Sequence, residues 1–116
     1  MTTIGVILGS IRQGRVGEGV AHWVRDTGNA RDSVEYRLLD LAEFNVPALT
    51  AATVPGAANK QYDDEAVTAW SNAVDACDGF VFVTPEYNHS IPGTMKNAFD
   101  SLASEWAGKP VAFVGY

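Results

Sequence analysis

The chain has 116 residues, 47% of them hydrophobic, and its eight basic and fourteen acidic residues give a formal net charge of −6. This length predicts one domain, residues 1–116, with a core of its own. The acidic balance argues against binding to a nucleic-acid backbone, and no apolar run reaches the roughly eighteen residues of a membrane-spanning helix. A single cysteine, Cys77, excludes an intrachain disulfide, and the N-terminus lacks a signal-peptide pattern, so we expect a cytoplasmic protein.

Apolar runs and helical periodicities alternate along the first half of the chain. The run Ile4–Leu8 predicts a first, central strand. A helix ending near Thr27–Gly28 is predicted next, and alternation across Ser33–Leu39 then predicts a half-covered edge strand. Residues 40–60, which are interrupted by prolines, predict a long connection. The apolar stripe of the predicted helix consists of Val16, Val20, Trp23 and Val24.

The second half repeats this alternation. A second helix is predicted after the acids at positions 63–65, and residues 80–83 lack polar alternation, which predicts a strand buried on both faces. Ser90 is predicted as the N-cap of a third helix, and residues 111–114 predict a fourth strand. The apolar stripes of the two helices are Val67, Trp70, Val74 and Cys77 in one, and Met95, Ala98, Phe99 and Leu102 in the other.

Strands and helices in strict alternation predict an α/β fold with a doubly wound parallel sheet and right-handed crossovers. Tyr116 follows the fourth strand almost at once, so no helix of this sequence would cover that strand. We therefore expect an apolar edge or face there that favours association. Either the chain is a fragment, or another subunit completes it.

The segment from Gly9 to Gly17 joins the first strand to the first helix and has the composition of an anion site. Its glycines permit a tight turn, the helix N-terminus presents N–H groups, and Ser10, Arg12 and Arg15 add one hydroxyl and two guanidinium groups. A P-loop is excluded because Arg15 stands where lysine belongs, and a G-x-G-x-x-G motif is absent. The pattern predicts a phosphate pocket; a plain turn with solvated arginines is the alternative.

The loop after the third strand offers flat contacts and neutral hydrogen-bonding groups. Pro85 and Tyr87 can lie against a planar heterocycle, and Asn88 can form hydrogen bonds with it. Glu86 and His89 could serve in acid–base chemistry, but neither is assigned a catalytic role, and the scattered histidines predict no metal site. A phosphate pocket beside this platform predicts a phosphorylated aromatic cofactor.

Two motifs carry a resemblance to a known family. Gly9-Ser10-x-Arg12 follows the first strand, and Thr84-Pro85-Glu86-Tyr87-Asn88-x-Ser90-x-Pro92-Gly93-x-x-Lys96-Asn97-Ala98-x-Asp100 follows the third, with Lys109-Pro110-Val111 before the fourth. Together they resemble the NADPH-dependent FMN reductase family, which has the flavodoxin-like fold and includes quinone, azo-dye and chromate reductases. The resemblance covers the whole chain.

The resemblance implies FMN as cofactor and NADPH or NADH as co-substrate. It assigns the FMN phosphate to the first loop and the isoalloxazine ring to the second. Two departures matter: many relatives have a second serine where this chain has Arg15, and relatives continue past the fourth strand through a helix, a fifth strand and a last helix. The residues assigned to the cofactor are Ser10, Arg12, Arg15, Val16 and Gly17 in the first loop, and Pro85, Glu86, Tyr87, Asn88 and Ser90 in the second.

The leading hypothesis is therefore an oxidoreductase that transfers hydride from NAD(P)H to FMN and then to a quinone or another small acceptor. A one-electron carrier of the flavodoxin type is one alternative, although such carriers favour a phosphate loop rich in serine and threonine. A non-catalytic interaction domain is another. Relatives are dimers or tetramers, so a homo-oligomer is expected. The preference between NADH and NADPH and the physiological acceptor stay open.

Overall fold

A computed structural model describes all of residues 1–116 and contains one parallel four-stranded sheet. The strands are β1 (Thr2–Leu8), β2 (Val34–Asp40), β3 (Gly79–Thr84) and β4 (Val111–Gly115), in the order β2-β1-β3-β4. This order confirms the predicted doubly wound, flavodoxin-like α/β fold, with the chain ending after β4. The central position of β1 and the edge position of β2 are confirmed as well.

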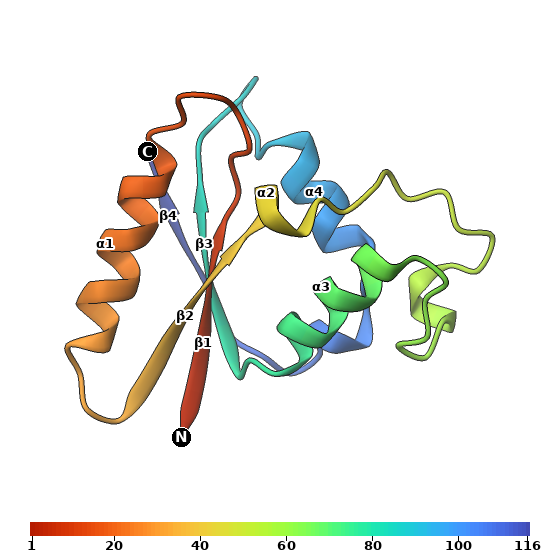
Figure 1. Ribbon diagram of the computed structural model, residues 1–116, viewed down its shortest axis with the longest axis horizontal. Coiled ribbons are helices and arrows are strands. Elements are labelled where there is room, and N and C mark those ends of the chain that lie inside the picture. Colours follow the sequence, from red (N-terminus) through yellow and green to blue (C-terminus); the bar gives the residue numbers. More distant parts are fainter.

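Helices cover both faces of the sheet (Figure 1). Helix α1 (Gly17–Asn29) lies on one face, and α3 (Glu65–Asp75) and α4 (Gly93–Asp100) lie on the other. No helix is both long enough and apolar enough to cross a bilayer. Three short elements were not predicted from the sequence: α2 (Leu41–Phe44) and the 3-10 turns η1 (Pro55–Ala57) and η2 (Ser104–Trp106).

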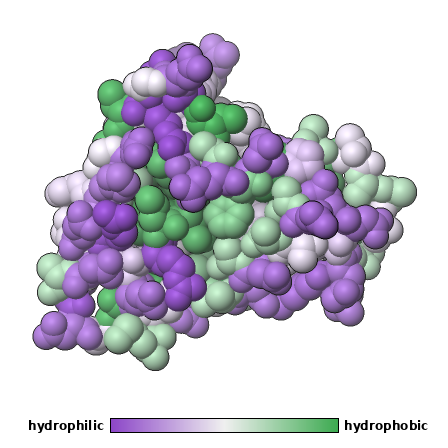
Figure 2. All heavy atoms as spheres, in the orientation of Figure 1, coloured by the Kyte–Doolittle hydropathy of each residue, from purple (hydrophilic) through white to green (hydrophobic).

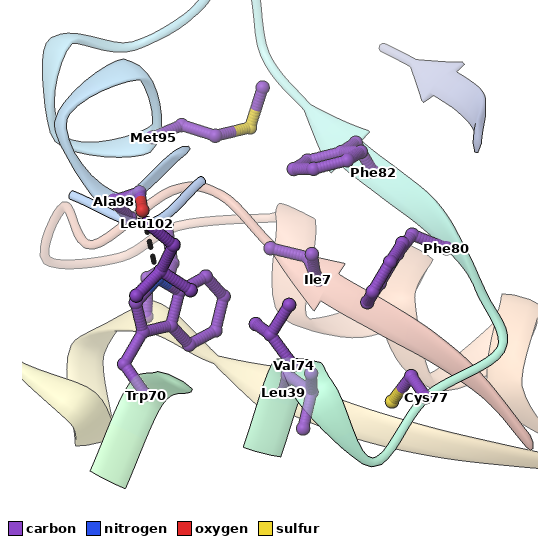
Figure 3. Packing of buried hydrophobic residues seen from close by; sticks show 11 residues of the cluster. Ile7, Leu39, Trp70, Val74, Cys77, Phe80, Phe82, Met95, Ala98 and Leu102 are labelled. Atoms are coloured by element: carbon purple, nitrogen blue, oxygen red, sulfur yellow. Dashed lines mark hydrogen bonds between the residues drawn. The ribbon is translucent and has the colours of Figure 1, made fainter. Parts of the chain in front are cut away.

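The larger core cluster lies between the sheet and the α3–α4 layer (Figure 3). Trp70 is fully buried there, and its indole N–H donates to the Ala98 carbonyl at 2.8 Å, which ties α3 to α4. Cys77 lies beyond the end of α3 but belongs to the same cluster. A smaller cluster of five buried residues, which includes Val24 and Val83, joins α1 to the opposite face.

The predicted apolar stripe of α1 is wrong in two of its members. Val16 precedes the helix and is 67% exposed, and Trp23 is 63% exposed. The helix instead turns mostly small residues to the sheet, because a close approach leaves little room for side chains: a Cβ on Gly28 would collide with the ring of Tyr36. The buried residues of α1 are Gly17, Ala21, Val24 and Gly28.

The predicted start of α4 is also wrong. Ser90 does not cap this helix, which begins at Gly93 after Pro92 and has no side-chain cap. Within α4 the predicted stripe holds for Met95 and Ala98, whereas Phe99 is 42% exposed. Phe99 packs against Trp106 with ring centroids 5.2 Å apart, so η2 covers one side of its ring.

The edges of the sheet, β2 and β4, are partly exposed at the surface. Figure 2 shows apolar side chains in the middle of the view, where the sheet lies between α1 and α3 in Figure 1. On the edge strand β4, Val111 and Phe113 are exposed, and the Phe113 ring stacks on Phe82 at a centroid distance of 5.6 Å. The uncovered apolar face expected on the fourth strand is therefore present.

Candidate functional site

The two loops singled out in the sequence leave neighbouring strands at the same edge of the sheet. Leu8 of β1 lies opposite Val83 of β3, and the Gly9 N–H donates to the Val83 carbonyl at 3.0 Å. Both loops then rise from this edge (Figure 1). A Cβ on Gly9 would come within 2.5 Å of the Met95 sulfur, so a larger residue would have to displace the Met95 side chain where the two loops begin.

The first loop, residues 9–17, keeps most of its backbone donors unpaired. Apart from the Gly9 bond, one N–H of the loop before the helix donates within the chain, from Arg15 to the Arg12 carbonyl at 3.2 Å. The N–H groups of residues 10–14 and of Val16 have no partner in the chain. Unpaired N–H groups at the start of a helix favour an anion, since both the donors and the helix dipole attract negative charge.

The two arginines of this loop have different environments. Arg12 is exposed, and its guanidinium donates to the Gln13 carbonyl at 3.1 Å. Arg15 instead makes two parallel hydrogen bonds to the carboxylate of Asp40, at 2.7 and 2.6 Å. Hydrogen bonding to Asp40 raises the pKa of Arg15. Burial works to raise the pKa of Asp40, but the hydrogen bonds from Arg15 and from the Ala42 N–H outweigh it, so the pKa of Asp40 is lowered.

The second loop is a tight two-residue turn. Asn88 and His89 both have positive φ, at 52° and 67°, and Tyr87 and Ser90 exchange backbone hydrogen bonds of 2.9 and 3.1 Å. Two central residues of positive φ are typical of a type I′ turn, in which asparagine is favoured. The turn leaves Tyr87 43% exposed. Ser90 closes this turn, which explains why it does not cap α4.

A hollow of about 480 Å³ opens between the second loop and the end of β4. It includes three of the residues assigned to the cofactor, Pro85, Glu86 and Ser90, but not Tyr87 or Asn88. Its lining consists of Thr84, Pro85, Glu86, His89, Ser90, Ile91, Gly115 and Tyr116. A cavity of about 450 Å³ under the 47–64 connection contains none of the assigned residues.

Sequence reasoning missed Tyr116, which lies against both the hollow and the first loop. Its N–H donates to the Thr84 carbonyl at 3.3 Å, and its hydroxyl occupies the space that a Cβ on Gly17 would need. Burial and the neighbouring Tyr87 raise the pKa of Tyr116, and the Ser10 side chain opposes that rise. The available signal was its position, since a residue directly after a parallel strand lies at the same edge as the loops.

Glu86 and His89 line the hollow, but their side chains are largely open to solvent. Their side chains are 68% and 98% exposed, with 3.6 Å between the nearest carboxylate oxygen and Nδ1. No cluster of three or more potential metal-ligating side chains occurs in the chain. The site thus consists of unpaired backbone donors, one exposed guanidinium and a polar turn beside a hollow.

These groups fit a phosphorylated flavin in their chemistry. Residues 9–17 contain no carboxylate, so nothing in the loop itself would repel a phosphate. Ser10 is 3% exposed and lies at the base of the loop. The second loop has an exposed aromatic ring, Tyr87, and an exposed amide, Asn88, side by side in its turn, and these groups suit contact with a planar heterocycle.

Known proteins are similar to this chain over almost its whole length. Residues 2–116 match the NADPH-dependent FMN reductase family. An NAD(P)H-dependent FMN reductase of Nectria sp. is 42% identical over 120 residues, with 100% of this chain and 60% of the relative covered. A protein of the same description from Schizosaccharomyces pombe is 37% identical over 111 residues, which cover 96% of this chain and 56% of the relative.

A solved structure is similar in fold. The flavoenzyme NAD(P)H:acceptor oxidoreductase of Paracoccus denitrificans superposes with a TM-score of 0.76 at 26% identity, covering 99% of this chain and 60% of the other. The chain thus spans about 60% of the length of these proteins. On the match of residues 2–116 and the identity to its relatives, the chain belongs to the NADPH-dependent FMN reductase family.

Proposed function

We propose that the chain binds FMN at the β1–β3 edge and acts as an NAD(P)H-dependent reductase of a quinone or another small electron acceptor. The observation that carries the proposal is the junction of the two loops at the Gly9–Val83 hydrogen bond. It supports a single site with a phosphate end and a ring end. The names of the relatives, both NAD(P)H-dependent FMN reductases, support the same activity.

Each loop has a separate task in this proposal. The N–H groups of residues 10–14 and Val16, with Ser10, Arg12 and Gly17, hold the phosphate. Pro85, Glu86, Tyr87, Asn88 and Ser90 line the isoalloxazine ring. Bound FMN would supply the chemistry, since a flavin accepts hydride from a nicotinamide and passes electrons to an acceptor.

The protein contributes orientation and electrostatics rather than a side-chain base. The type I′ turn sets the backbone position of Asn88, whose amide would form hydrogen bonds with the ring. Backbone donors near a flavin favour the negative charge that the ring carries when reduced. Exposed Glu86 and His89 are not needed for this step, so neither is assigned a catalytic role.

The activity is tested with purified chain and two measurements. A flavin-fluorescence titration should show binding of FMN, and anaerobic addition of NADPH or NADH should bleach the bound flavin. Steady-state oxidation of NAD(P)H with a quinone should follow. Binding without bleaching would identify a flavodoxin-type carrier, and no binding at all would favour an interaction domain.

We also propose a homo-oligomer, a dimer or tetramer, formed in part through β4. Two exposed apolar side chains on this edge strand support it, since Val111 is 46% exposed and Phe113 is 64% exposed. Apolar side chains on an unpaired strand favour association with a second copy.

A further inference from the structure

The ion pair between Arg15 and Asp40 connects the first loop to the rest of the sheet. Its two hydrogen bonds are 2.7 and 2.6 Å long, and the two side chains are 13% and 10% exposed. A third bond runs from the same guanidinium to the Ser10 carbonyl at 2.7 Å. Arg15 therefore links the two ends of the loop, since Ser10 is near its start and Arg15 is near its end.

Asp40 is itself fixed by the fold. It is the last residue of β2, lies opposite Leu8 in the register of the sheet, and caps α2 by accepting from the Ala42 N–H at 2.9 Å. A bidentate arginine–carboxylate contact has strict geometric requirements. The guanidinium is consequently held against the sheet.

The ion pair also changes which positive charge of the loop is available to an anion. Because Asp40 neutralises Arg15, the guanidinium left exposed in the loop is that of Arg12. The carboxylate of Glu18 adds to this effect, at 4.0 Å from Nε of Arg15. The sequence predicts contact between Arg15 and the phosphate from the charge of Arg15 alone, and in the structure that charge is paired with Asp40.

We propose that Arg15 and Asp40 are positioning residues for the phosphate end of the FMN site. Their ion pair holds the loop in the shape that leaves the N–H groups of residues 10–14 and Val16 available, and Arg15 does not itself bind the phosphate. This inference rests on the proposed FMN binding. It assigns Asp40, which no motif indicated, a role at the site.

The two possible roles of Arg15 make opposite predictions for Asp40. If Arg15 bound the phosphate, Asp40 would compete for the guanidinium, and Asp40→Asn would strengthen FMN binding or leave it unchanged. If the pair positions the loop, Asp40→Asn weakens FMN binding as Arg15→Gln does. The double variant then binds no more weakly than the weaker single variant, because either change alone removes the same contact.

The experiment measures the dissociation constants of FMN and riboflavin by fluorescence quenching in the full chain. Riboflavin lacks the phosphate, so the ratio of the two constants isolates the phosphate end from a general loss of folding. We expect each single variant to lower the preference for FMN by about tenfold or more, the size of loss seen when outer-shell partners are removed at metal sites. Asp75→Asn is the control, since Asp75 pairs with Lys60 at the end of α3.

Arg15→Lys decides the question if Asp40→Asn does not fold, as judged by circular dichroism. Lysine keeps the charge but cannot make the bidentate contact, so positioning predicts a loss like that of Arg15→Gln, and direct charge contact predicts near-normal FMN binding. An unchanged or higher FMN preference in Asp40→Asn overturns the inference alone. Failure of the wild-type chain to bind either flavin overturns the proposed function together with it.

Discussion

Glu105 is a fully buried carboxylate, and two of its partners, Tyr62 and Ser71, lie far from it along the chain. It accepts from the hydroxyls of Tyr62 and Ser71, each at 2.6 Å, and from the Ala103 N–H at 3.0 Å. Burial works to raise the pKa of Glu105, but these hydrogen bonds outweigh it and hold the pKa below the ordinary value. The contacts join α3 and the preceding connection to η2.

Replacing this carboxylate should destabilise the protein in a pH-dependent way. Glu105→Gln replaces an acceptor oxygen with an amide N–H, which would face the donor groups of Tyr62, Ser71 or Ala103. We expect a loss of about 1–3 kcal/mol in the free energy of unfolding at neutral pH. The pKa of Glu105 is lower in the folded protein than in the unfolded chain, where it is about 4.3. The carboxylate therefore adds to the free energy of unfolding above that unfolded pKa, and this stabilisation is lost as the pH falls through the folded pKa.

Urea unfolding of wild type and variant at neutral and acidic pH checks this expectation. The two free energies of unfolding should converge as the pH falls. Glu43→Gln serves as the control, since the Glu43 side chain is exposed and lies in the short helix α2, away from the Glu105 contacts. A difference that stays constant with pH would show that the carboxylate charge is not what stabilises this contact.

At the scale of an element, α1 offers a matched pair of glycines. A Cβ on Gly28 would collide with the ring of Tyr36, whereas a Cβ on Gly19 would meet nothing within 4 Å. We expect Gly28→Ala to lower the free energy of unfolding by about 1–3 kcal/mol through overpacking. Gly19→Ala should raise it by roughly 0.5–1 kcal/mol, since alanine is the better helix former.

Denaturant titrations of both variants measure the two effects in one helix. Opposite signs are the expected result. Equal stabilisation by both would mean that α1 can move away from β2 at little cost, and that its small residues do not set the distance between helix and sheet.

Comparison of these elements with the sequence shows where prediction works. All four strands were found within two residues of their ends, because β1, β3 and β4 contain uninterrupted apolar runs and β2 alternates as a half-covered edge strand does. Two members of the α1 stripe, Val16 and Trp23, were misjudged because periodicity favours large apolar side chains, whereas here glycine and alanine face the sheet beside Val24. The short α2 depends on the Asp40 cap and tertiary contacts, and it has no periodicity of its own.

The candidate site was predictable in outline for a similar reason. Loops after parallel neighbouring strands must meet at one edge, so the position of both loops followed from the strand order. The partner of Arg15 could not be read from the sequence, because Asp40 is 25 residues away and only the fold brings them together. The assignment of individual residues to FMN stays a prediction.

At the scale of the whole molecule, the exposed face of β4 leads to a prediction about association. Phe113→Glu places a charge on this face, and we expect it to shift the protein towards the monomer, since burying an unpaired carboxylate is unfavourable. Trp23→Glu is the matched control, because Trp23 on α1 is exposed to nearly the same extent, 63% against 64%.

Size-exclusion chromatography with light scattering measures the molar mass of both variants and of the wild-type chain. The expected result is a smaller mass for Phe113→Glu alone. A mass shared by all three proteins would contradict an interface through β4. A reduced mass for both variants would point to general apolar association rather than to a contact of this strand.

The sheet order also has a consequence for how the chain reaches its native state. The strand made first, β1, lies in the middle and hydrogen-bonds on both sides, and the Thr3 N–H reaches Asp78 across 75 residues. A ribosome releases this apolar strand long before its second neighbour exists. Such distant pairings slow folding, so newly made chains expose Val6, Ile7 and Leu8 for longest, and refolding yields should fall as protein concentration rises.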